Sequence, residues 1–313
     1  MPVKFELQGH RGARGLKPEN TLPSFEVAFD LGVSAVETDI HLSCDGVPIV
    51  MHDAVLNDRL FRVIGERNVP APRSGALISS LTVDQLRGYQ AIGNPHPERF
   101  PQQDPSITPL AALFCRRRGL DPYAPPTLAE LLEFTSAYAG DLGQTAGKSE
   151  RQRSGAARLC FDLELKRVPF HPEVINDNFD GNAAGRLELA VVEAVRSAGA
   201  VDRTIVRSFD HRSVRAVRRV EPGVTGAILV TGTAPVALGA LAREAGAQIY
   251  CPDYLFLDAL HIRHAHAEGL RVVPWTVNDL GHCKRLIDWG VDGITTDFPD
   301  RLADLLHRRG LEF

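Results

Sequence analysis

The sequence lacks several features that mark common classes of protein. It has no basic excess, with 35 Lys and Arg against 39 Asp and Glu and a formal net charge of -4. Proteins that bind the nucleic-acid backbone depend on clustered positive charge, so we expect no nucleic-acid partner. A small phosphorylated substrate is compatible with this charge, because one or two cations in a cleft suffice to bind it.

Long apolar segments are also missing. No run approaches the roughly 18 to 20 residues of a membrane span, so we expect no integral membrane segment. The first ten residues lack the apolar core of a secretory signal, and we therefore expect a cytoplasmic protein. The five cysteines are odd in number and form no C-x-x-C pair, which indicates reduced thiols.

The second half of the chain repeats one unit: an amphipathic helical stretch, a glycine and a short β-branched run. A glycine just past a helix is typical of a left-handed C-cap, and alternating helices and strands predict a parallel sheet covered by helices. Eight strands are predicted in the whole chain, at residues 5–9, 34–42, 159–165, 204–207, 225–230, 248–251, 271–275 and 293–296. Eight such units favour an α/β TIM barrel over an open, doubly wound sheet.

A ninth apolar run, residues 47–51, follows an Asp-Gly pair typical of a hairpin. If Asp45 and Gly46 are the two turn residues, the numbers of paired residues sum to 91, and His52 lies opposite Asp39. The next stretch, about 53–126, is rich in Pro and Gly and too long for an ordinary loop. We read residues 1–313 as a single TIM barrel domain with this insertion subdomain after the second strand. Residues 140–158 are expected to be a mobile polar connection.

Chemistry in a barrel takes place at the carboxyl ends of the strands. Glu37 and Asp39 are two residues apart on one predicted strand and therefore face the same side. Glu164 lies near the end of the neighbouring predicted strand. Three carboxylates that converge would repel each other unless a hard divalent cation such as Mg²⁺ or Ca²⁺ bound between them. The sequence therefore predicts a metal site at these residues.

Two histidines and two basic side chains are predicted to lie beside the three carboxylates. His10 ends the first strand, and the hairpin returns His52 to the carboxylates. A pair of imidazoles suits general acid and base catalysis near neutral pH. Arg11 and Lys166 are predicted to bind an anionic substrate.

Some assignments stay open at this level. Glu19, Asn20 and Thr21 fit either a helix start or an active site, and Trp275 fits either core packing or a substrate platform. We expect seven other histidines, which have no consistent metal-ligand spacing, to lie on the surface: His171, His211, His261, His264, His266, His282 and His307.

Taken together, these motifs resemble the glycerophosphodiester phosphodiesterase family. The matching strings run almost from end to end of the chain: Gly9-His10-Arg11-Gly12, Pro18-Glu19-Asn20-Thr21, Glu37-x-Asp39, Asp45-Gly46-x-Pro48-x-Val50-x-His52-Asp53, Pro126-Thr127-Leu128-x-Glu130, Glu164-Leu165-Lys166, Ser208-Phe209, Trp275-Thr276-Val277-Asn278 and Gly293-Ile294-Thr295-Thr296-Asp297-x-Pro299. The resemblance implies a metal held by Glu37, Asp39 and Glu164, with His10 and His52 as the acid/base pair. It also implies that Arg11 and Lys166 lie near the phosphate and Trp275 near the glycerol.

The implied activity is metal-dependent hydrolysis of a small-molecule glycerophosphodiester to sn-glycerol 3-phosphate and an alcohol, through a cyclic phosphate. The sequence does not decide which histidine acts first; we favour His10 as first base and His52 as first acid. The alternatives are a lysophospholipase D-like phosphodiesterase and a barrel that binds phosphodiesters without turnover. The divalent ion, the leaving alcohol and the oligomeric state are not specified by the sequence.

Overall fold

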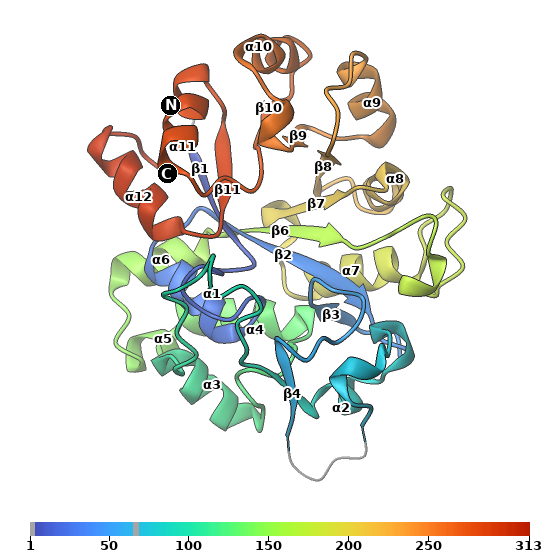
Figure 1. Cartoon of the computed structure of the whole chain (residues 1–313), viewed down its shortest axis with the longest axis vertical. Helices are drawn as coiled ribbons and strands as arrows, with labels where there is room; N and C mark the ends of the chain where they lie inside the picture. Colours follow the sequence, from blue (N-terminus) through green and yellow to red (C-terminus); the bar gives the residue numbers. More distant parts are fainter. Residues whose placement is uncertain (1–3, 65–68) are drawn as a thin grey trace.

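The computed structural model describes residues 4–64 and 69–313, and it places eight parallel strands in a ring (Figure 1). Neighbouring strands follow the order β10-β9-β8-β7-β6-β2-β1-β11. Their bounds are β1 Glu6–His10, β2 Ala35–Leu42, β6 Cys160–Leu165, β7 Thr204–Ser208, β8 Thr225–Val230, β9 Ile249–Pro252, β10 Arg271–Val272 and β11 Gly293–Thr296. Backbone hydrogen bonds from Asp292 to Val272 (2.9 Å) and from Thr295 to Pro274 (3.0 Å) join the two end strands. The predicted TIM barrel is confirmed.

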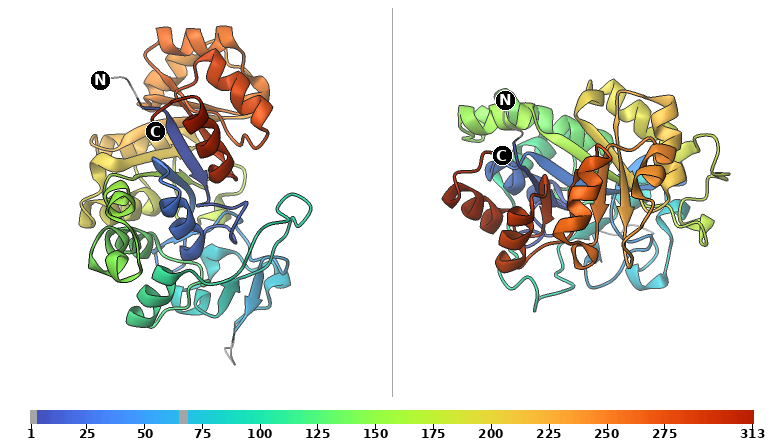
Figure 2. Two further views of the ribbon diagram at one scale, coloured as in Figure 1. Left: turned by 90° about the vertical axis from the view of Figure 1, so that its left-hand side faces the viewer. Right: turned by 90° about the horizontal axis from the view of Figure 1, so that it is seen from above.

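Helices follow the strands and lie outside the ring (Figures 1 and 2). The helices that complete the eight strand–helix units are α1 Leu22–Asp30, α4 Leu128–Ala139, α7 Arg186–Ser197, α8 His211–Val220, α9 Leu238–Ala245, α10 Ala259–Ala267, α11 Leu280–Trp289 and α12 Pro299–Arg308. Left-handed glycines follow α9 and α11, as the sequence pattern predicts. Among the described residues, none of the helices has the length and apolar character needed to cross a membrane.

The strand predicted at 271–275 is shorter in the structure. Regular pairing ends at Val272, because Pro274 has no N–H to donate. Isolated backbone hydrogen bonds continue along β9 on either side of the proline. The Val273 N–H donates to the Tyr250 carbonyl (2.9 Å), and the Trp275 N–H donates to the Pro252 carbonyl (3.1 Å).

The hairpin after β2 forms, but with a different register from the predicted one. Strand β3 (Pro48–Val50) pairs antiparallel with β2, and Ile40 lies opposite Val50, so paired numbers sum to 90. The loop has three residues, of which the last, Gly46, has φ +83°. Such a loop ends in a left-handed residue and shifts the register by one position. Met51, and not His52, is bonded to the Asp39 carbonyl (2.9 Å).

The segment between β3 and α4 contains its own small elements: β4 Phe61–Val63, α2 Val83–Leu86, β5 Tyr89–Ala91 and α3 Pro109–Arg118. Strands β4 and β5 pair antiparallel outside the barrel. A separate apolar cluster, which includes Leu60, Phe61, Ile78 and Tyr89, fills the space behind them.

Residues 140–158 are not the mobile connection that we expected from the sequence. They form two short helices, α5 (Asp141–Thr145) and α6 (Glu150–Ala157). A capping box between Ser149 and Gln152 starts α6, and Lys148 binds the buried Glu26 carboxylate (2.6 Å). These polar residues are therefore used in caps and ion pairs.

The barrel interior has two unlike halves. One side is apolar and contains Ile205 of β7, Ala227 and Leu229 of β8, Ile249 and Cys251 of β9, and Val273 just after β10. On the side of β11, β1, β2 and β6 it is polar, and the Gln8 amide donates to Asp162 (2.7 Å) while Thr295 donates to Gln8 (2.5 Å). Buried polar groups of this kind need partners, and here they supply them to one another. The polar half continues into the cluster of charged side chains at the carboxyl ends of the strands.

Candidate active site

A cavity of about 380 Å³ opens at the carboxyl ends of the strands, which we call the mouth of the barrel. The residues that line it come from strands on several sides and from the insertion: His10, Arg11, Arg14, Glu37, His52, Arg99, Glu164, Lys166, Arg207, Phe209, Leu229, Trp275 and Thr276. Seven of the eight predicted site residues are among them. The eighth, Asp39, lies beside Glu37 and Glu164.

The three predicted carboxylates converge. One oxygen each from Glu37, Asp39 and Glu164 lies within 4.8 Å of the others, and all three side chains are buried. Strand pairing explains this, because Asp39 lies opposite Glu164 in the parallel register of β2 and β6. This is the one such group of possible metal ligands in the part of the chain that the structure describes.

The donor set suits a hard divalent cation. Asp39 Oδ1 is buried without a hydrogen-bond partner, although Lys166 Nζ lies 3.4 Å away. An unpaired buried carboxylate oxygen is costly, and a cation bound by oxygen ligands would remove that cost. The residues present therefore fit a divalent cation that prefers oxygen ligands.

Cations already surround the carboxylates. Lys166 Nζ lies 2.7 Å from Glu164 Oε1, and Arg11 Nε lies 3.3 Å from Asp39 Oδ2. Burial alone would raise the pKa of Asp39, but Arg11 and Lys166 hold it well below its usual value. Burial would lower the pKa of Lys166, whereas Glu164 and Asp39 raise it. Both signs of charge are thus maintained in the cavity at neutral pH.

His10 is held by a buried aspartate. Its Nδ1 lies 2.6 Å from Asp297 Oδ1, and its Nε2 faces the cavity, 3.7 Å from Glu37 Oε2. Burial lowers the pKa of His10 to about 4, although Asp297 opposes this effect. The second oxygen of Asp297 accepts a bond from the Asn278 amide (2.7 Å). His10 is therefore neutral at pH 7 with one ring nitrogen directed at the cavity.

His52 has an aspartate of its own, closer to solvent. His52 Nδ1 lies 2.7 Å from Asp53 Oδ1, and Asn57 donates to the other oxygen of Asp53 (2.8 Å). The buried His41 ring contacts the His52 carbonyl through Nε2 (3.0 Å). Thus His52 reaches the cavity as predicted, but its place opposite Asp39 in the hairpin was wrong by one residue.

The loop after β1 contains two residues with positive φ whose N–H groups bind the site carboxylates. Arg11 and Asn20 both adopt left-handed backbone conformations, with φ of +52° and +56°. The Arg11 N–H donates to Glu37 (3.1 Å), and the Asn20 amide donates to Asp39 (2.9 Å). Such backbone strain is typical of functional loops and persists only where other contacts enforce it.

The open question about Glu19, Asn20 and Thr21 is resolved by their contacts. Thr21 is the N-cap of α1, whereas Glu19 binds Arg11 (2.7 Å) and Arg14 (2.6 Å). Thr21 therefore starts the helix, and Glu19 with Asn20 belongs to the site.

Trp275 lies at the boundary between the packed barrel interior and the cavity. Its indole N–H donates to the Cys251 carbonyl (2.9 Å), which fixes the ring against the apolar half of the barrel. Its ring also meets Phe209 edge to face, with centroids 5.6 Å apart, and both residues line the cavity. The seven other histidines named above lie exposed or half-buried.

Sequence reasoning gave no role to four residues of the site: Arg14, Arg99, Arg207 and Asp297. Asp297 directly follows β11, so the strand-end rule that selected His10 applies to it equally. Arg207 lies inside β7, where its guanidinium contacts Glu37 (3.3 Å) and Asp162 (3.2 Å). Arg99 comes from the insertion, and nothing in the sequence around it indicates that it reaches the mouth.

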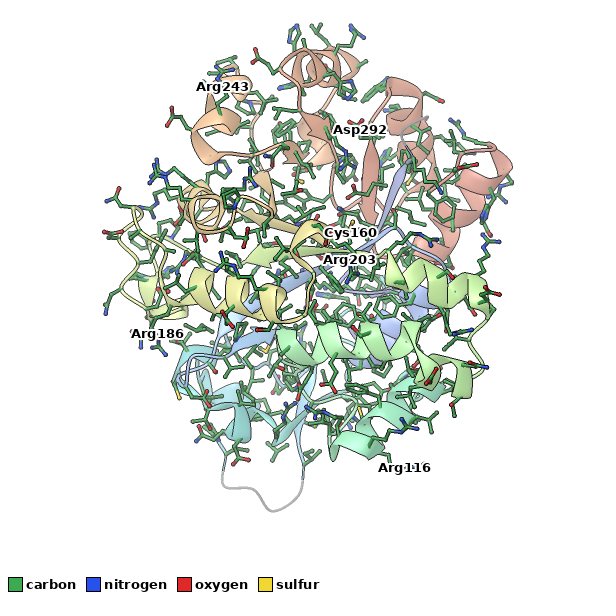
Figure 3. All side chains as sticks on the ribbon, turned by 180° about the vertical axis from the view of Figure 1, so that it is seen from behind. Arg116, Cys160, Arg186, Arg203, Arg243 and Asp292 are labelled. Atoms are coloured by element: carbon green, nitrogen blue, oxygen red, sulfur yellow. The ribbon has the colours of Figure 1, made fainter. Side chains whose placement is uncertain are left out.

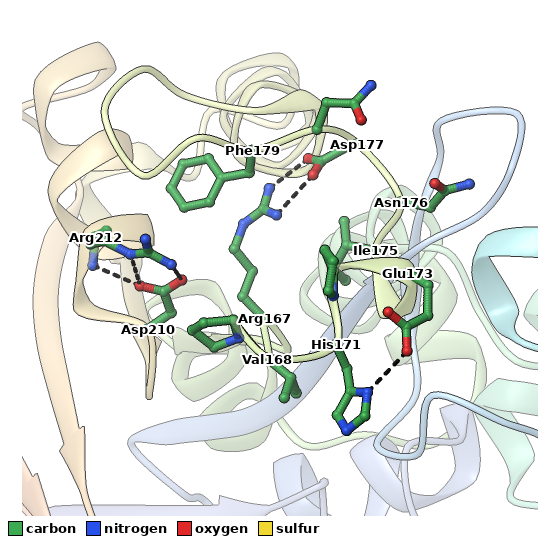
Figure 4. A pocket seen from close by; sticks show the side chains of 13 residues that line it. Arg167, Val168, His171, Glu173, Ile175, Asn176, Asp177, Phe179, Asp210 and Arg212 are labelled. Atoms are coloured by element: carbon green, nitrogen blue, oxygen red, sulfur yellow. Dashed lines mark hydrogen bonds and ion pairs between the residues drawn. The ribbon is translucent and has the colours of Figure 1, made fainter.

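A second hollow lies beside the mouth, between the loops after β6 and β7 (Figure 4). Its charged groups are paired with one another: Arg167 binds Asp177, Arg212 binds Asp210, and His171 binds Glu173. Phe179 stacks over Arg167, 4.0 Å from the guanidinium carbon. We read these contacts as the support of a long loop.

Comparison with known proteins places this barrel in a class, the TIM-barrel phosphoric diester hydrolases. The sequence profile described as the Glycerophosphoryl diester phosphodiesterase family matches residues 10–301. The chain belongs to this family.

Individual relatives match over nearly the whole chain. A glycerophosphodiester phosphodiesterase of Caldanaerobacter subterraneus is 24% identical over 310 residues, 98% of this chain and 100% of that protein. A putative glycerophosphoryl diester phosphodiesterase from Silicibacter pomeroyi is 28% identical, with a TM-score of 0.76 over 100% of this chain and 96% of that one. An Oleispira antarctica phosphodiesterase, solved in complex with its product sn-glycerol-3-phosphate, has the same fold at 21% identity, with a TM-score of 0.69 over 97% of each chain.

Proposed function

We propose that the protein hydrolyses glycerophosphodiesters to sn-glycerol 3-phosphate and an alcohol. The observation that carries the proposal is the cavity in which a three-carboxylate cluster, with the unpaired Asp39 Oδ1, lies beside two histidines that each have an aspartate partner. The named activity of the relatives and the product bound to the Oleispira antarctica enzyme support this substrate.

We assign Glu37, Asp39 and Glu164 as ligands of a divalent cation. When bound, such an ion stabilises negative charge on phosphate oxygens and lowers the pKa of a hydroxyl group. Arg11 and Lys166 border the carboxylates and would contact the phosphate. We propose that the Trp275 ring packs against the glycerol of the substrate.

The histidines would move the protons. His10 starts neutral, and its free Nε2 takes the proton of the glycerol 2-hydroxyl while that oxygen attacks phosphorus. His52 gives a proton to the departing alkoxide as the P–O bond to the alcohol breaks, which leaves a cyclic phosphate. In the second step His52 takes a proton from water, the hydroxide opens the ring, and His10 returns its proton to the 2-oxygen.

We also propose that residues 53–126 act as a subdomain that shapes the mouth. Their separate apolar cluster and the position of Arg99 in the cavity support this. The leaving alcohol would then face the insertion.

The test is release of sn-glycerol 3-phosphate from glycerophosphocholine and glycerophosphoethanolamine, with and without EDTA. We expect turnover that falls at least about 1,000-fold on chelation and returns with Mg²⁺, Ca²⁺ or Mn²⁺. Turnover that is the same with and without EDTA would show that the reaction needs no metal ion. No turnover with any metal would instead favour a binding barrel.

A second candidate is a lysophospholipase D-like reaction. The apolar edge that Phe209 and Trp275 give the cavity favours it. Rates on lysophosphatidylcholine and glycerophosphocholine, measured side by side, separate the two substrates.

A further inference from the structure

Most of the large hydrophobic side chains that are exposed in the described part of the chain lie on one face. Among the described residues, the large hydrophobic side chains that are exposed are Val63, Ile107, Val168, Phe170, Leu189, Phe209, Val236, Leu255, Phe256 and Leu260. Six of them lie in the loops that leave β6, β7, β8 and β9: Val168, Phe170, Phe209, Val236, Leu255 and Phe256. We call these six the apolar rim. Because the four strands are neighbours in the barrel, the rim is an arc around one side of the mouth.

The opposite face differs. None of these exposed side chains lies in a loop that connects a helix to the next barrel strand. Figure 3, seen from behind Figure 1, labels Cys160, Arg203 and Asp292 at or just before the starts of β6, β7 and β11. Scattered surface hydrophobics need no explanation, but six of these ten around one side of the mouth are typical of an interaction surface.

The rim side chains project strongly from the surface. Val236 is fully exposed, Phe170 is 87% exposed and Leu255 is 70% exposed. The loop that carries Val236, residues 231–237, contains no charged residue. Four separate loops supply these side chains.

The rim is continuous with the cavity. Phe209 belongs to both, and its ring contacts Trp275 inside the mouth. A protein seated on the rim would cover the route by which substrate enters. A lipid surface is different, since it presents phosphodiester groups at the same level as its apolar layer.

The chemistry of the substrate also points to lipid, and this step rests on the proposed function. A glycerophosphodiester is a glycerophospholipid without its fatty acids. The reaction that supplies it must therefore be a deacylation, which takes place where phospholipids are, at a lipid surface.

We propose that the apolar rim docks the protein on a phospholipid bilayer, with the mouth facing the lipid. Phe170, Val236 and Leu255 enter the interfacial layer, as do the apolar side chains of other peripheral proteins. The net charge of -4 gives no general attraction to anionic lipid, so binding depends on apolar insertion.

The test is co-sedimentation of the full chain with vesicles of phosphatidylcholine alone and of phosphatidylcholine with phosphatidylglycerol. The variant Phe170→Ser/Val236→Ser/Leu255→Ser removes the three most exposed rim side chains, none of which lines the cavity. We expect it to partition at least about 100-fold more weakly, since each buried apolar side chain contributes roughly tenfold or more. Val63→Ser, an exposed hydrophobic change on β4 of the insertion, is the matched control and should bind like the unaltered protein.

Turnover of soluble glycerophosphocholine, measured in parallel, keeps this proposal separate from the proposed function, because the triple variant should retain it. Absence of binding to phosphatidylcholine vesicles would overturn the docking surface. So would binding that needs phosphatidylglycerol and disappears at high salt, because this dependence marks an electrostatic contact. A dimer that the triple variant abolishes would show that a second copy of this chain covers the rim.

Discussion

The two histidine–aspartate pairs of the mouth have the same geometry but opposite surroundings. In the first pair the side chains of His10 and Asp297 are 12% and 0% exposed, and Asp297 has further contacts with Asn278 and Arg14. In the second pair His52 and Asp53 are 34% and 45% exposed. The barrel thus fixes one imidazole in a set orientation, while it leaves the other in contact with solvent. A base that must start neutral and an acid that must exchange protons with water need these two environments.

Removal of either imidazole should have the largest effect. We expect His10→Ala and His52→Ala each to lower kcat for glycerophosphocholine by about 10³ to 10⁴, since each histidine moves a proton in both steps. Circular dichroism should be used to check that the variants are folded. His264→Ala, at an exposed site on α10, is the control and should leave kcat unchanged. A rate near that of the unaltered protein in one variant would exclude that histidine from the chemistry.

The burial of His10 predicts a pH effect on stability. Its pKa is lowered from 6.5 to about 4, mainly by burial. Between pH 6.5 and pH 4, His10 is protonated in the unfolded chain but stays neutral in the folded chain. The free energy of unfolding therefore falls as the pH drops through this range. From pH 6.5 to pH 5 this costs between about 1 and 2 kcal/mol, about 15-fold in the folding equilibrium, because the unfolded His10 is already half protonated at pH 6.5.

Urea unfolding in EDTA, at pH 6.5 and pH 5, measures this effect. The loss of stability should be about 1 to 2 kcal/mol smaller in His10→Asn than in the unaltered protein. His41, whose pKa burial also lowers to about 4, contributes equally to both proteins and cancels. Equal losses in the two proteins would mean that the ring of His10 is more hydrated than the structure shows.

Much of the barrel and of the site is predictable from local sequence. The strands of the second half follow from the repeat of a helical stretch, a glycine and a short β-branched run, and the carboxylates follow from the two-residue period of a strand. His10, Glu37 and Glu164 can be placed because the ends of neighbouring parallel strands meet at one edge. These inferences need only periodicity and strand order.

Other features depend on details that periodicity does not contain. A third residue in the loop at Gly46 moved the hairpin by one position, which changes every pair between β2 and β3. The pairing of His10 with Asp297 joins residues 287 positions apart and is fixed only when the ring of strands closes. The apolar rim could not be foreseen either, because exposure depends on how the loops pack.

The claim that one histidine is fixed by burial and the other is open to solvent is tested most directly by removing the charge of each aspartate. Asp297→Asn and Asp53→Asn should be compared by kcat for release of sn-glycerol 3-phosphate from glycerophosphocholine, at one pH and one metal concentration. We predict that Asp297→Asn loses at least about tenfold more activity than Asp53→Asn, because water can replace the partner of the exposed His52 but cannot reach the buried pair. Equal losses, or a larger loss in Asp53→Asn, would contradict the account.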